Sequence, residues 1–594
     1  MISLENVTVS LPRGKPQAKT ILKDITLSIE TGERVLILGG NGSGKTTLLQ
    51  AVAGLIPLDS GTVTFSRCEE SCSEYPATPS IALLLQEPDN QFVASSVRNE
   101  LLLSAKSGMK LHGPNRGDAI RNAIEMFELE GILDRNPHRL SGGEKQRLAF
   151  ATVWLAAPDI LLLDEPTSYL DRRSRKRCYE FVESLNAGGV TILWAAPGGE
   201  DLVQSDMTVW IDKGKLRYVG SSNHLFSQEH DCLSTLIPPP LVALSSSLSR
   251  ELGSRDRFRE RVSNQRGTLM KWNGRLRIQT IAKELIDLVD SAHEIKADGS
   301  MKYEKIRPGP HLSRASKPDQ EVLAFENASF AYDTCEAIHG ATFQIPSGQC
   351  MGVCGPNGSG KSTILSLASG VLEPTSGRVR RLGMGELDAG EKRIFHLFQS
   401  PERMFFAETV FEELAFGLKY LFGEKDRMDD IVSHALSQSG LTPQSVLDRS
   451  PFSLSFGEMR RLAFAVCVSL RPKLLLLDEP TACLDVPGKE VLRGILDRFL
   501  SKGGTALVAS HDVDFLCEIC GRLVYLDQGR VVADVDISSG TLPVEANWPD
   551  EAKPLIVAVQ DAMAAMGVAV APRAVTVNRL VDLLDYSSQT RNPT

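Results

Sequence analysis

Two glycine-rich stretches that end in a lysine and a hydroxyl residue occur in the chain, with their lysines 316 residues apart. The first is Gly39-Gly40-Asn41-Gly42-Ser43-Gly44-Lys45-Thr46, and the second is Gly355-Pro356-Asn357-Gly358-Ser359-Gly360-Lys361-Ser362. Glycine allows backbone N–H groups to approach an anion closely, and the lysine adds a positive charge. Each stretch therefore predicts a loop that binds the phosphates of a nucleotide, with its hydroxyl group available to a cation.

An apolar run that ends in two acidic residues follows each glycine-rich stretch. The runs are Ile160-Leu161-Leu162-Leu163-Asp164-Glu165 and Leu474-Leu475-Leu476-Leu477-Asp478-Glu479. Continuous apolar strands of this kind lie in the buried middle of a parallel sheet. The first acid of each pair is expected to hold Mg²⁺, and the second to polarise an attacking water. The same two motifs in the same order predict two ATP-handling halves.

The flanking sequence indicates the elements that position these residues. Apolar stretches at 34–38 and 351–354 precede the glycine loops, and helical stretches after the loops end near Gly54 and Gly370. A strand, a loop and a helix in this order form the setting that a phosphate-binding loop requires. The expected fold is therefore α/β, with two P-loop domains in tandem.

The segments that follow the two halves also resemble each other. Pro240-Leu241-Val242-Ala243 matches Pro554-Leu555-Ile556-Val557, so each half is expected to carry a small helical extension. We accordingly divide the chain into four parts. They are a first ATPase domain at 1–225, an extension and linker at 226–320, a second ATPase domain at 321–537 and a C-terminal extension at 538–594.

Composition narrows the class of protein. A net charge of -9 argues against a chain that coats nucleic acid along its whole length. Eleven scattered cysteines fit a reducing compartment better than a disulfide framework. No secretory signal is visible, and no run approaches the roughly 20 apolar residues that span a bilayer. We therefore expect a soluble protein or one held at a membrane by partners.

A third motif lies between the first two in each half. It reads Leu140-Ser141-Gly142-Gly143-Glu144-Lys145-Gln146-Arg147 in the first half and Leu454-Ser455-Phe456-Gly457-Glu458-Met459-Arg460-Arg461 in the second. A serine and glycines that open a helix form a further clamp for a phosphate. With these motifs the chain resembles the nucleotide-binding domains of ABC ATPases, whose signature is Leu-Ser-Gly-Gly-Gln or Glu. The resemblance implies ATP and Mg²⁺ as ligands and a helical subdomain around each signature.

The same resemblance assigns roles to other residues. Gln86 and Gln399 match the Q-loop glutamine, which links Mg²⁺ and water to the transport partner. His511 matches the switch histidine, and Tyr332 matches the aromatic residue that stacks on adenine. The implied catalytic residues are Glu479, His511, Gln399, Glu165 and Gln86. The implied metal ligands are Thr46, Gln86, Asp164, Ser362, Gln399 and Asp478. The implied nucleotide contacts are Gly39, Asn41, Gly42, Ser43, Gly44, Lys45, Thr46, Thr47, Ser141, Gly142, Gly143, Tyr332, Gly355, Asn357, Gly358, Ser359, Gly360, Lys361, Ser362, Thr363, Ser455 and Gly457.

The two ATP sites are not equivalent if the halves pair head to tail, as ABC domains do. The site on Lys361 then has every matching residue, including an intact signature from the first half. The site on Lys45 has Leu11 in place of the adenine aromatic and Pro197 in place of the histidine, and its closing signature contains Phe456 in place of glycine. Proline cannot hold a phosphate and a water as an imidazole can. We expect the Lys45 site to bind ATP and hydrolyse it slowly, while the Lys361 site drives the cycle.

The residues after each Q-loop glutamine indicate which group of ABC ATPases the chain resembles. They read Gln86-Glu87-Pro88-Asp89-Asn90-Gln91 and Gln399-Ser400-Pro401-Glu402-Arg403-Met404, and Glu413-Leu414-Ala415-Phe416-Gly417 follows in the second half. These segments are similar to those of ATPases from energy-coupling factor (ECF) transporters. That similarity implies a fused ATPase pair at the cytoplasmic face of the membrane, with a membrane T component and a substrate-binding S component. The substrate would be a vitamin, a precursor of one or a transition-metal ion.

Two alternatives remain open at this stage. Fused ATPases of another importer type share the same motifs. Soluble tandem ABC ATPases instead act on ribosomes or nucleic acid, and a basic stretch in the linker has the charge to touch phosphates. Its basic residues are Arg250, Arg255, Arg257, Arg259, Arg261, Arg266, Lys271, Arg275, Arg277 and Lys283. We favour a solvated linker over a nucleic-acid contact, because charge runs usually lie on solvated surfaces.

Overall fold

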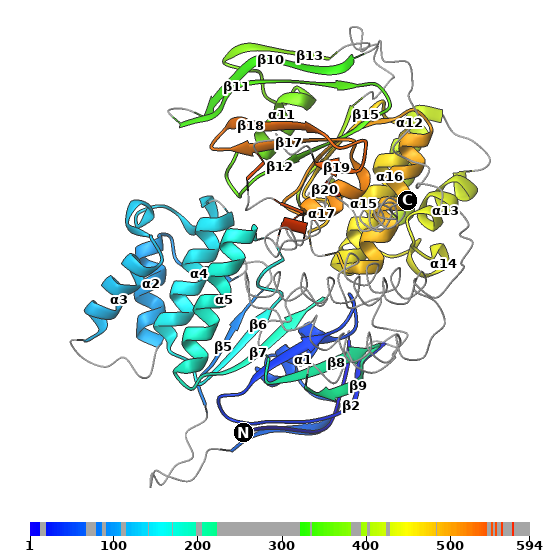
Figure 1. The fold of residues 1–594 in the computed structure, drawn as a ribbon. Coiled ribbons are helices and arrows are strands. Elements are labelled where there is room, and N and C mark those ends of the chain that lie inside the picture. The colour runs from blue at the N-terminus through cyan, green and yellow to red at the C-terminus, as the bar shows by residue number, and fades with distance from the viewer. Residues whose placement is uncertain are drawn as a thin grey trace, which may run out of the picture. The chain divides into compact units, whose positions relative to one another are not determined.

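The protein is represented by a computed structural model, drawn in Figure 1. It describes residues 1–11, 19–66, 79–85, 91–107, 115–140, 142–168, 170–197, 205–221, 321–332, 335–381, 394–400, 404–422, 428–482 and 484–542, with a few positions between 548 and 574. Residues up to 221 belong to one compact unit and those from 321 onward to a second. The predicted linker at 226–320, with its basic stretch, lies outside the described residues.

A six-stranded, largely parallel sheet forms the centre of the first unit, in the order β5-β6-β7-β3-β8-β9. Only β8 and β9 run antiparallel, as a hairpin at one edge. The predicted apolar strands at 34–38 and 160–164 are β3 and β6, neighbours of β7 in the middle of the sheet. The bounds are β3 Arg34–Leu38, β5 Ile81–Leu84, β6 Ile160–Asp164, β7 Thr191–Ala196, β8 Met207–Asp212 and β9 Lys215–Gly220.

The second unit repeats this sheet in the order β14-β15-β16-β12-β17-β18. The run before the second acid pair is β15, and all five of its residues are buried. Parallel pairing again covers the middle, and β17 and β18 form the antiparallel edge. The bounds are β12 Cys350–Cys354, β14 Ile394–Leu397, β15 Leu474–Asp478, β16 Thr505–Ala509, β17 Arg522–Asp527 and β18 Arg530–Asp536.

A three-stranded antiparallel sheet accompanies each large sheet. The orders are β2-β1-β4 in the first unit and β11-β10-β13 in the second. Apolar side chains of these strands pack with those of the large sheet and of the helix after the glycine loop, which makes one core on that side of each unit. The bounds are β1 Ile2–Leu11, β2 Lys19–Ile29, β4 Ser60–Phe65, β10 Glu321–Tyr332, β11 Cys335–Pro346 and β13 Ser376–Arg381.

Helices cover the sheets and form the predicted subdomains around the signatures. In the first unit α2 and α3 pack on α4, and in the second α12 and α13 pack on α15 (Figure 1). The first unit contains α1 Lys45–Val52, α2 Val97–Ser107, α3 Asn115–Met126, α4 Gly142–Ala156 and α5 Arg172–Ala187. The second contains α11 Lys361–Ser369, α12 Val410–Phe422, α13 Met428–Gln438, α14 Pro443–Val446, α15 Phe456–Ser469, α16 Val486–Ser501 and α17 Val513–Ile519. None of the helices in these described ranges has the length and hydropathy needed to cross a bilayer.

The C-terminal extension packs on the second unit. Trp548 is buried with its ring centroid 5.8 Å from that of Tyr525 on β17, and Val557 is buried in the same core. The described residues of this extension also include a short strand pair, β19 Thr541–Leu542 with β20 Arg573–Ala574. The expected helical extension therefore contains a strand pairing that the sequence did not predict, and most of its predicted helix lies outside the described residues.

A buried glutamate in each half holds the loop before its helix. Glu413 is 5% exposed and accepts hydrogen bonds from the N–H groups of Phe406 and Ala407, at 3.0 and 2.9 Å. Glu100 does the same for Val93 and Ala94 in the first half. The acid of the Glu-x-Ala-Phe-Gly segment thus fixes the chain that follows the Q-loop.

Replacing Glu413 by alanine is expected to lower the free energy of unfolding by about 1–3 kcal/mol, because two partly buried N–H groups lose their charged acceptor. Urea unfolding of the full chain measures this loss. Glu408→Ala is the matched control, since Glu408 is an exposed acid of the same loop. Equal midpoints for the two variants would show that the Glu413 clamp contributes nothing.

Candidate functional site

Each glycine loop connects a central strand to a helix at the carboxyl edge of the parallel sheet. Helices α1 and α11 begin directly at Lys45 and Lys361, after Gly44 and Gly360 with φ of 108° and 102°. Side-chain-bearing residues adopt such angles rarely. At Gly355 an added Cβ would lie 2.0 Å from the carbonyl oxygen of Leu526. The loop shape therefore requires glycine where the sequence has it.

The two loop lysines are buried and connect the loop to the second acid of each acid pair. Lys45 donates to the carbonyl oxygen of Gly39 at 2.8 Å and forms an ion pair with Glu165 at 3.3 Å. Lys361 donates to Gly355 at 2.9 Å and lies 3.7 Å from a carboxylate oxygen of Glu479. A phosphate that enters either loop meets a positive charge that is already in place.

The first acid of each pair lies beside the hydroxyl group of the glycine loop. Asp164 is hydrogen-bonded by Thr46, and Asp478 by Ser362. One oxygen of each aspartate is buried without a hydrogen-bond partner among the described residues, and so are the hydroxyls of Ser43 and Ser359. Buried polar atoms of this kind are costly unless a ligand satisfies them. Carboxylate and hydroxyl oxygens are the ligands that Mg²⁺ prefers, so the donor set fits a magnesium–nucleotide complex.

The second acids share an unusual backbone but differ in their partners. Glu165 and Glu479 have φ of 48° and 47°, and their N–H groups donate to Ala195 and Ala509 on the neighbouring strand. Such strained conformations occur at functional sites when the surrounding structure holds them. Both carboxylates are thereby aimed from the end of a central strand toward the loop lysine.

His511 changes the charge state of Glu479. Its Nδ1 lies 2.8 Å from a Glu479 oxygen, which also accepts from the Ser510 hydroxyl at 3.3 Å. Burial alone would raise the pKa of Glu479, but the charge and hydrogen bond of His511, together with Lys361, lower it to about 2. Glu479 is therefore an ionised base that can polarise a water at neutral pH.

The first half has a different arrangement around Glu165. Pro197 occupies the position of His511, at the end of β7, and the Ser168 hydroxyl donates to Glu165 at 3.2 Å. Burial raises the pKa of Glu165, and Lys45 opposes this shift. Without an imidazole partner, the carboxyl of Glu165 has a higher pKa than that of Glu479 and holds a proton more readily.

The remaining predicted residues are placed in part. Ser455 caps α15 through a reciprocal pair of hydrogen bonds with Glu458, so the second signature does open a helix. Gly142 and Gly143 begin α4, whereas Ser141 lies outside the described residues. Gln399 is exposed just after β14, and Gln86 lies outside the described residues. Asn41, Gly42, Thr47, Asn357, Gly358 and Thr363 lie in the loops or first helical turns, and Gly457 is buried in the first turn of α15.

The proposed adenine contacts lie at the ends of the small sheets. Tyr332 ends β10 and is half exposed, with its ring centroid 4.8 Å from that of Phe330. Leu11 ends β1 at the equivalent place and is 36% exposed. An exposed aromatic face at this strand end is free to receive a flat base, and a leucine offers a smaller apolar surface.

Sequence reasoning missed Arg460, which reaches the site from the signature helix. Its guanidinium donates to the backbone oxygens of Glu479 and Gln399. Arg460 lies within the signature motif, but a contact to backbone oxygens leaves no pattern in side-chain types. Only the fold brings these three residues together.

The strand–loop–helix units, the acid-terminated strands and the capped signature helix together define a P-loop ATPase of the ABC type. Residues 22–168 and 338–482 each match the ABC transporter family. The chain belongs to the ABC transporter ATPase family and carries two of its ATP-binding domains in tandem.

One relative and two solved structures illustrate what this chain is similar to. A Vibrio vulnificus (strain YJ016) protein, assigned as ABC transporter ATP-binding protein VVA0347, is 28% identical over 88% of both chains. The solved structure of CbiO1 from Clostridium perfringens, titled as part of the ABC transporter complex CbiONQ, is 28% identical over 37% of this chain and 90% of that one, with a TM-score of 0.34. An archaeal ribosome recycling factor aABCE1, solved with the ribosomal stalk protein aP1, is 20% identical over 89% of this chain and 88% of that one, with a TM-score of 0.50.

Burial of the Asp478 carboxyl makes the stability of the nucleotide-free protein depend on pH. Burial raises its pKa from 3.8 to about 6, against the hydrogen bond from Ser362. Between these pH values the folded chain holds a proton that the unfolded chain has released, so this group's contribution to stability falls as pH rises. Asp478→Asn removes the charge and is expected to stabilise the nucleotide-free protein by about 1–3 kcal/mol at pH 7.

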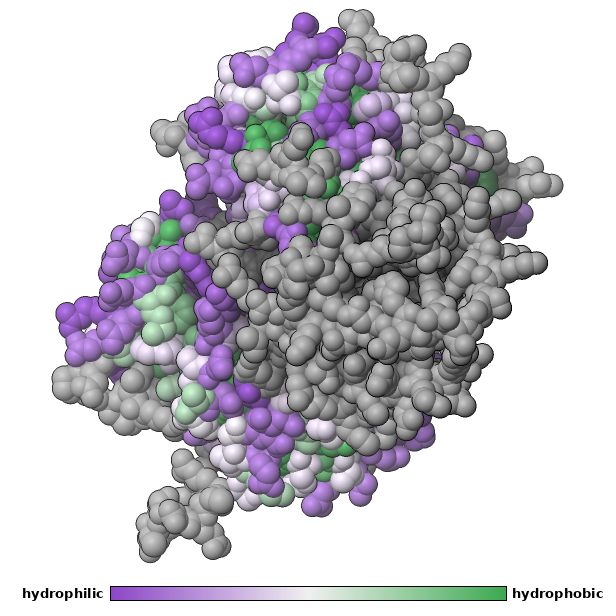
Figure 2. All heavy atoms as spheres, viewed as in Figure 1, coloured by the Kyte–Doolittle hydropathy of each residue, from purple (hydrophilic) through white to green (hydrophobic). Residues whose placement is uncertain are grey.

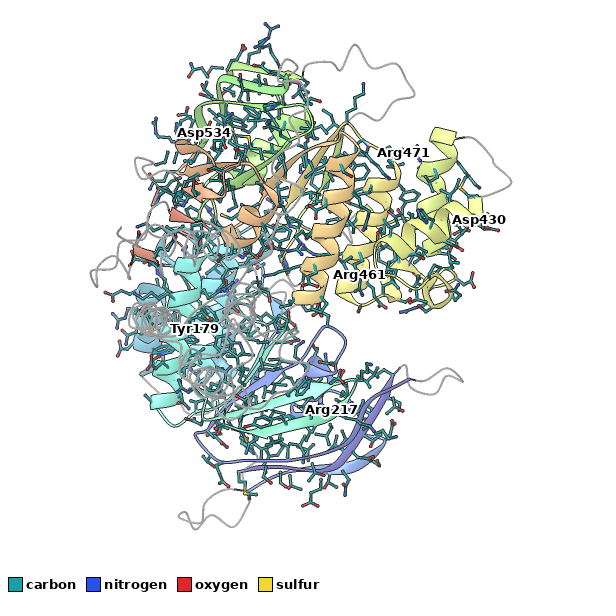
Figure 3. The ribbon with its side chains drawn as sticks, turned by 45° about the vertical axis from the view of Figure 1, so that its right-hand side comes forward. Tyr179, Arg217, Asp430, Arg461, Arg471 and Asp534 are labelled. Atoms are coloured by element: carbon teal, nitrogen blue, oxygen red, sulfur yellow. The ribbon has the colours of Figure 1, made fainter. Side chains whose placement is uncertain are left out.

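Thermal unfolding of Asp478→Asn and the unchanged protein, without nucleotide or Mg²⁺, checks this expectation. The difference should be present at pH 7 and shrink as the pH falls through 6 toward 3.8, below which the aspartate is protonated in both the folded and the unfolded chain. Asp430→Asn, an exposed residue of α13 labelled in Figure 3, is the control with an expected change below about 1 kcal/mol. A lower melting temperature for Asp478→Asn at pH 7 would contradict the account.

Proposed function

We propose that this chain powers uptake of a small substrate as the fused ATPase of an ECF-type importer. In this proposal it sits peripherally at the cytoplasmic face of the cell membrane and works with a T component and a substrate-binding S component. The substrate is a vitamin, a precursor of one or a transition-metal ion, selected by the S component. The assignment of the relative as a transporter ATP-binding protein supports a transport role.

The observation that carries the proposal is an exposed apolar patch beside each Q-loop. In the second half Phe406 and Phe416 are 63% and 59% exposed, and their ring centroids are 4.8 Å apart. Val93 and Leu103 are exposed at the matching places of the first half. Adjacent exposed rings of this kind are typical of a surface that binds a partner, because contiguous apolar surface is unfavourable in contact with water.

In the first half, exposed apolar residues also lie on α2. Leu102 and Leu103 of α2 are both exposed, and Figure 2 shows hydrophobic side chains among hydrophilic ones over the α2–α5 region. Glu100 and Glu413 fix the loops that carry these patches, as described above. A pair of such patches, one in each half, suits a partner that touches both halves, which is how a T component would dock.

Head-to-tail pairing of the halves, within one chain or between two, would complete each ATP site. The Lys361 site would then be closed by Ser141, Gly142 and Gly143, and the Lys45 site by Ser455 and Gly457 with Phe456 between them. In each site Mg²⁺ would be held by the loop hydroxyl, the first acid and the Q-loop glutamine, namely Thr46, Asp164 and Gln86 or Ser362, Asp478 and Gln399. Bound Mg²⁺ would neutralise charge on the phosphates.

Turnover would depend on which groups contact the carboxylate of Glu479. In the free structure Lys361 and His511 both hold this carboxylate. The negative charge of a γ-phosphate is a competing partner for Lys361, which would leave Glu479 with His511 and a water to polarise. At the Lys45 site Pro197 offers no such ring, so we propose binding with slow hydrolysis there.

Isolation of the chain from its native membranes tests the proposal. We expect two small membrane proteins to co-isolate with the unchanged chain, and Phe416→Ser to lose them because a docking ring is removed. Val371→Ser, an equally exposed apolar residue at 66%, is the matched control and should retain them. Basal ATPase activity should be the same for both variants.

Other partners would overturn the proposal in distinct ways. Co-sedimentation with ribosomes and no membrane partner would favour the soluble tandem ATPases, and would contradict our expectation that nucleic acid is not a partner. A pair of large membrane subunits of sugar-importer type would keep the transport role and reject the ECF assignment.

A further inference from the structure

Arg460 is a buried charged residue that lies one turn into the signature helix of the second unit. It is 3% exposed on α15, next to Arg461, which Figure 3 labels. Its Nη1 donates to the backbone oxygen of Glu479 at 2.6 Å, and its Nη2 donates to the backbone oxygen of Gln399 at 2.9 Å. One guanidinium therefore connects three motifs that are far apart in the sequence.

The two carbonyl groups belong to segments that need external support. Glu479 has a left-handed backbone with φ of 47°, and its N–H group is held by Ala509. Arg460 holds the other side of the same residue through its carbonyl oxygen. Gln399 is the second residue after the end of β14, in a segment that belongs to no helix or strand. A planar fork of N–H donors is well suited to fix two carbonyl groups at once.

The first unit has a shorter side chain at the same place. Gln146 of α4 donates to the backbone oxygen of Pro166 at 2.7 Å, the residue after Glu165. A glutamine amide carries no charge and does not have the reach of a guanidinium. The pair Arg460 and Gln146 is therefore a second difference between the halves, beside His511 and Pro197.

We propose that Arg460 is a positioning residue for hydrolysis, which fixes Glu479 and the Q-loop segment at Gln399 to the helix that carries the signature. This inference rests on the proposed role of Glu479 as the base at the Lys361 site. Without the guanidinium the carboxylate keeps its contacts with Lys361 and His511 but loses its support from α15. ATP then still binds, because the loop and its lysine are unchanged, whereas the base is misplaced for the attacking water.

The test uses the full chain in which Glu165→Gln has removed the other candidate base. Arg460→Gln installs the residue of the other half, and Arg460→Lys keeps a positive charge without the fork. We expect Arg460→Gln to lower kcat by about 10- to 100-fold while the affinity for a fluorescent ATP analogue changes by less than about threefold. Arg460→Lys should fall between this variant and its parent.

Arg493→Gln is the matched control, because Arg493 is 47% exposed and its ion pair is with Glu518, which is not a residue of the proposed site. A kcat of Arg460→Gln equal to that of Arg493→Gln would overturn the proposal. A parallel loss of ATP affinity and melting temperature would also overturn it, since it would show a merely structural role. If Glu165→Gln alone abolishes turnover, the assignment of hydrolysis to the Lys361 site is wrong. Arg460→Gln and Arg493→Gln are then compared in the unmodified chain, and equal kcat values there would overturn the proposed role of Arg460.

Discussion

Each half buries a lysine and two carboxylates at the carboxyl edge of a parallel sheet, and the rest of the structure serves to hold these charges. An isolated buried charge is unfavourable by several kcal/mol unless partners compensate for it. Lys45 and Lys361 are compensated by loop carbonyl oxygens and by Glu165 or Glu479. The apolar strands, the glycine loop and the helix start exist to bring these groups within reach of one another. A nucleotide then replaces part of this compensation with its own charges.

The same constraint is met differently around the second acid of each half. Where His511 supports Glu479, burial is outweighed and the carboxyl stays ionised. Where Pro197 replaces the histidine, burial raises the pKa of Glu165 and a serine hydroxyl is the added donor. Binding needs only the loop and its lysine, which both halves keep. Hydrolysis needs a positioned and ionised base. In the second half His511 and Arg460 both contact Glu479.

The parts of the fold with strong local signals were predictable from the sequence. The strands that became β3, β6, β12 and β15, the glycine loops and the helix start at Ser455 all follow from patterns within a few residues. The strand pair β19 and β20 was not predicted, because two-residue strands have no periodicity to detect. The contacts of Arg460 were also missed, since they end on backbone oxygens 19 and 61 residues away. Such long-range contacts depend on the fold and not on residue type.

The central claim is that the Lys361 site drives the cycle while the Lys45 site mainly binds ATP. Steady-state ATPase activity of Glu479→Gln and Glu165→Gln, each in the complex with its membrane partners, tests this most directly. The account predicts that Glu479→Gln lowers activity by about 100-fold or more and that Glu165→Gln retains most of it. Equal losses in the two variants would contradict the account.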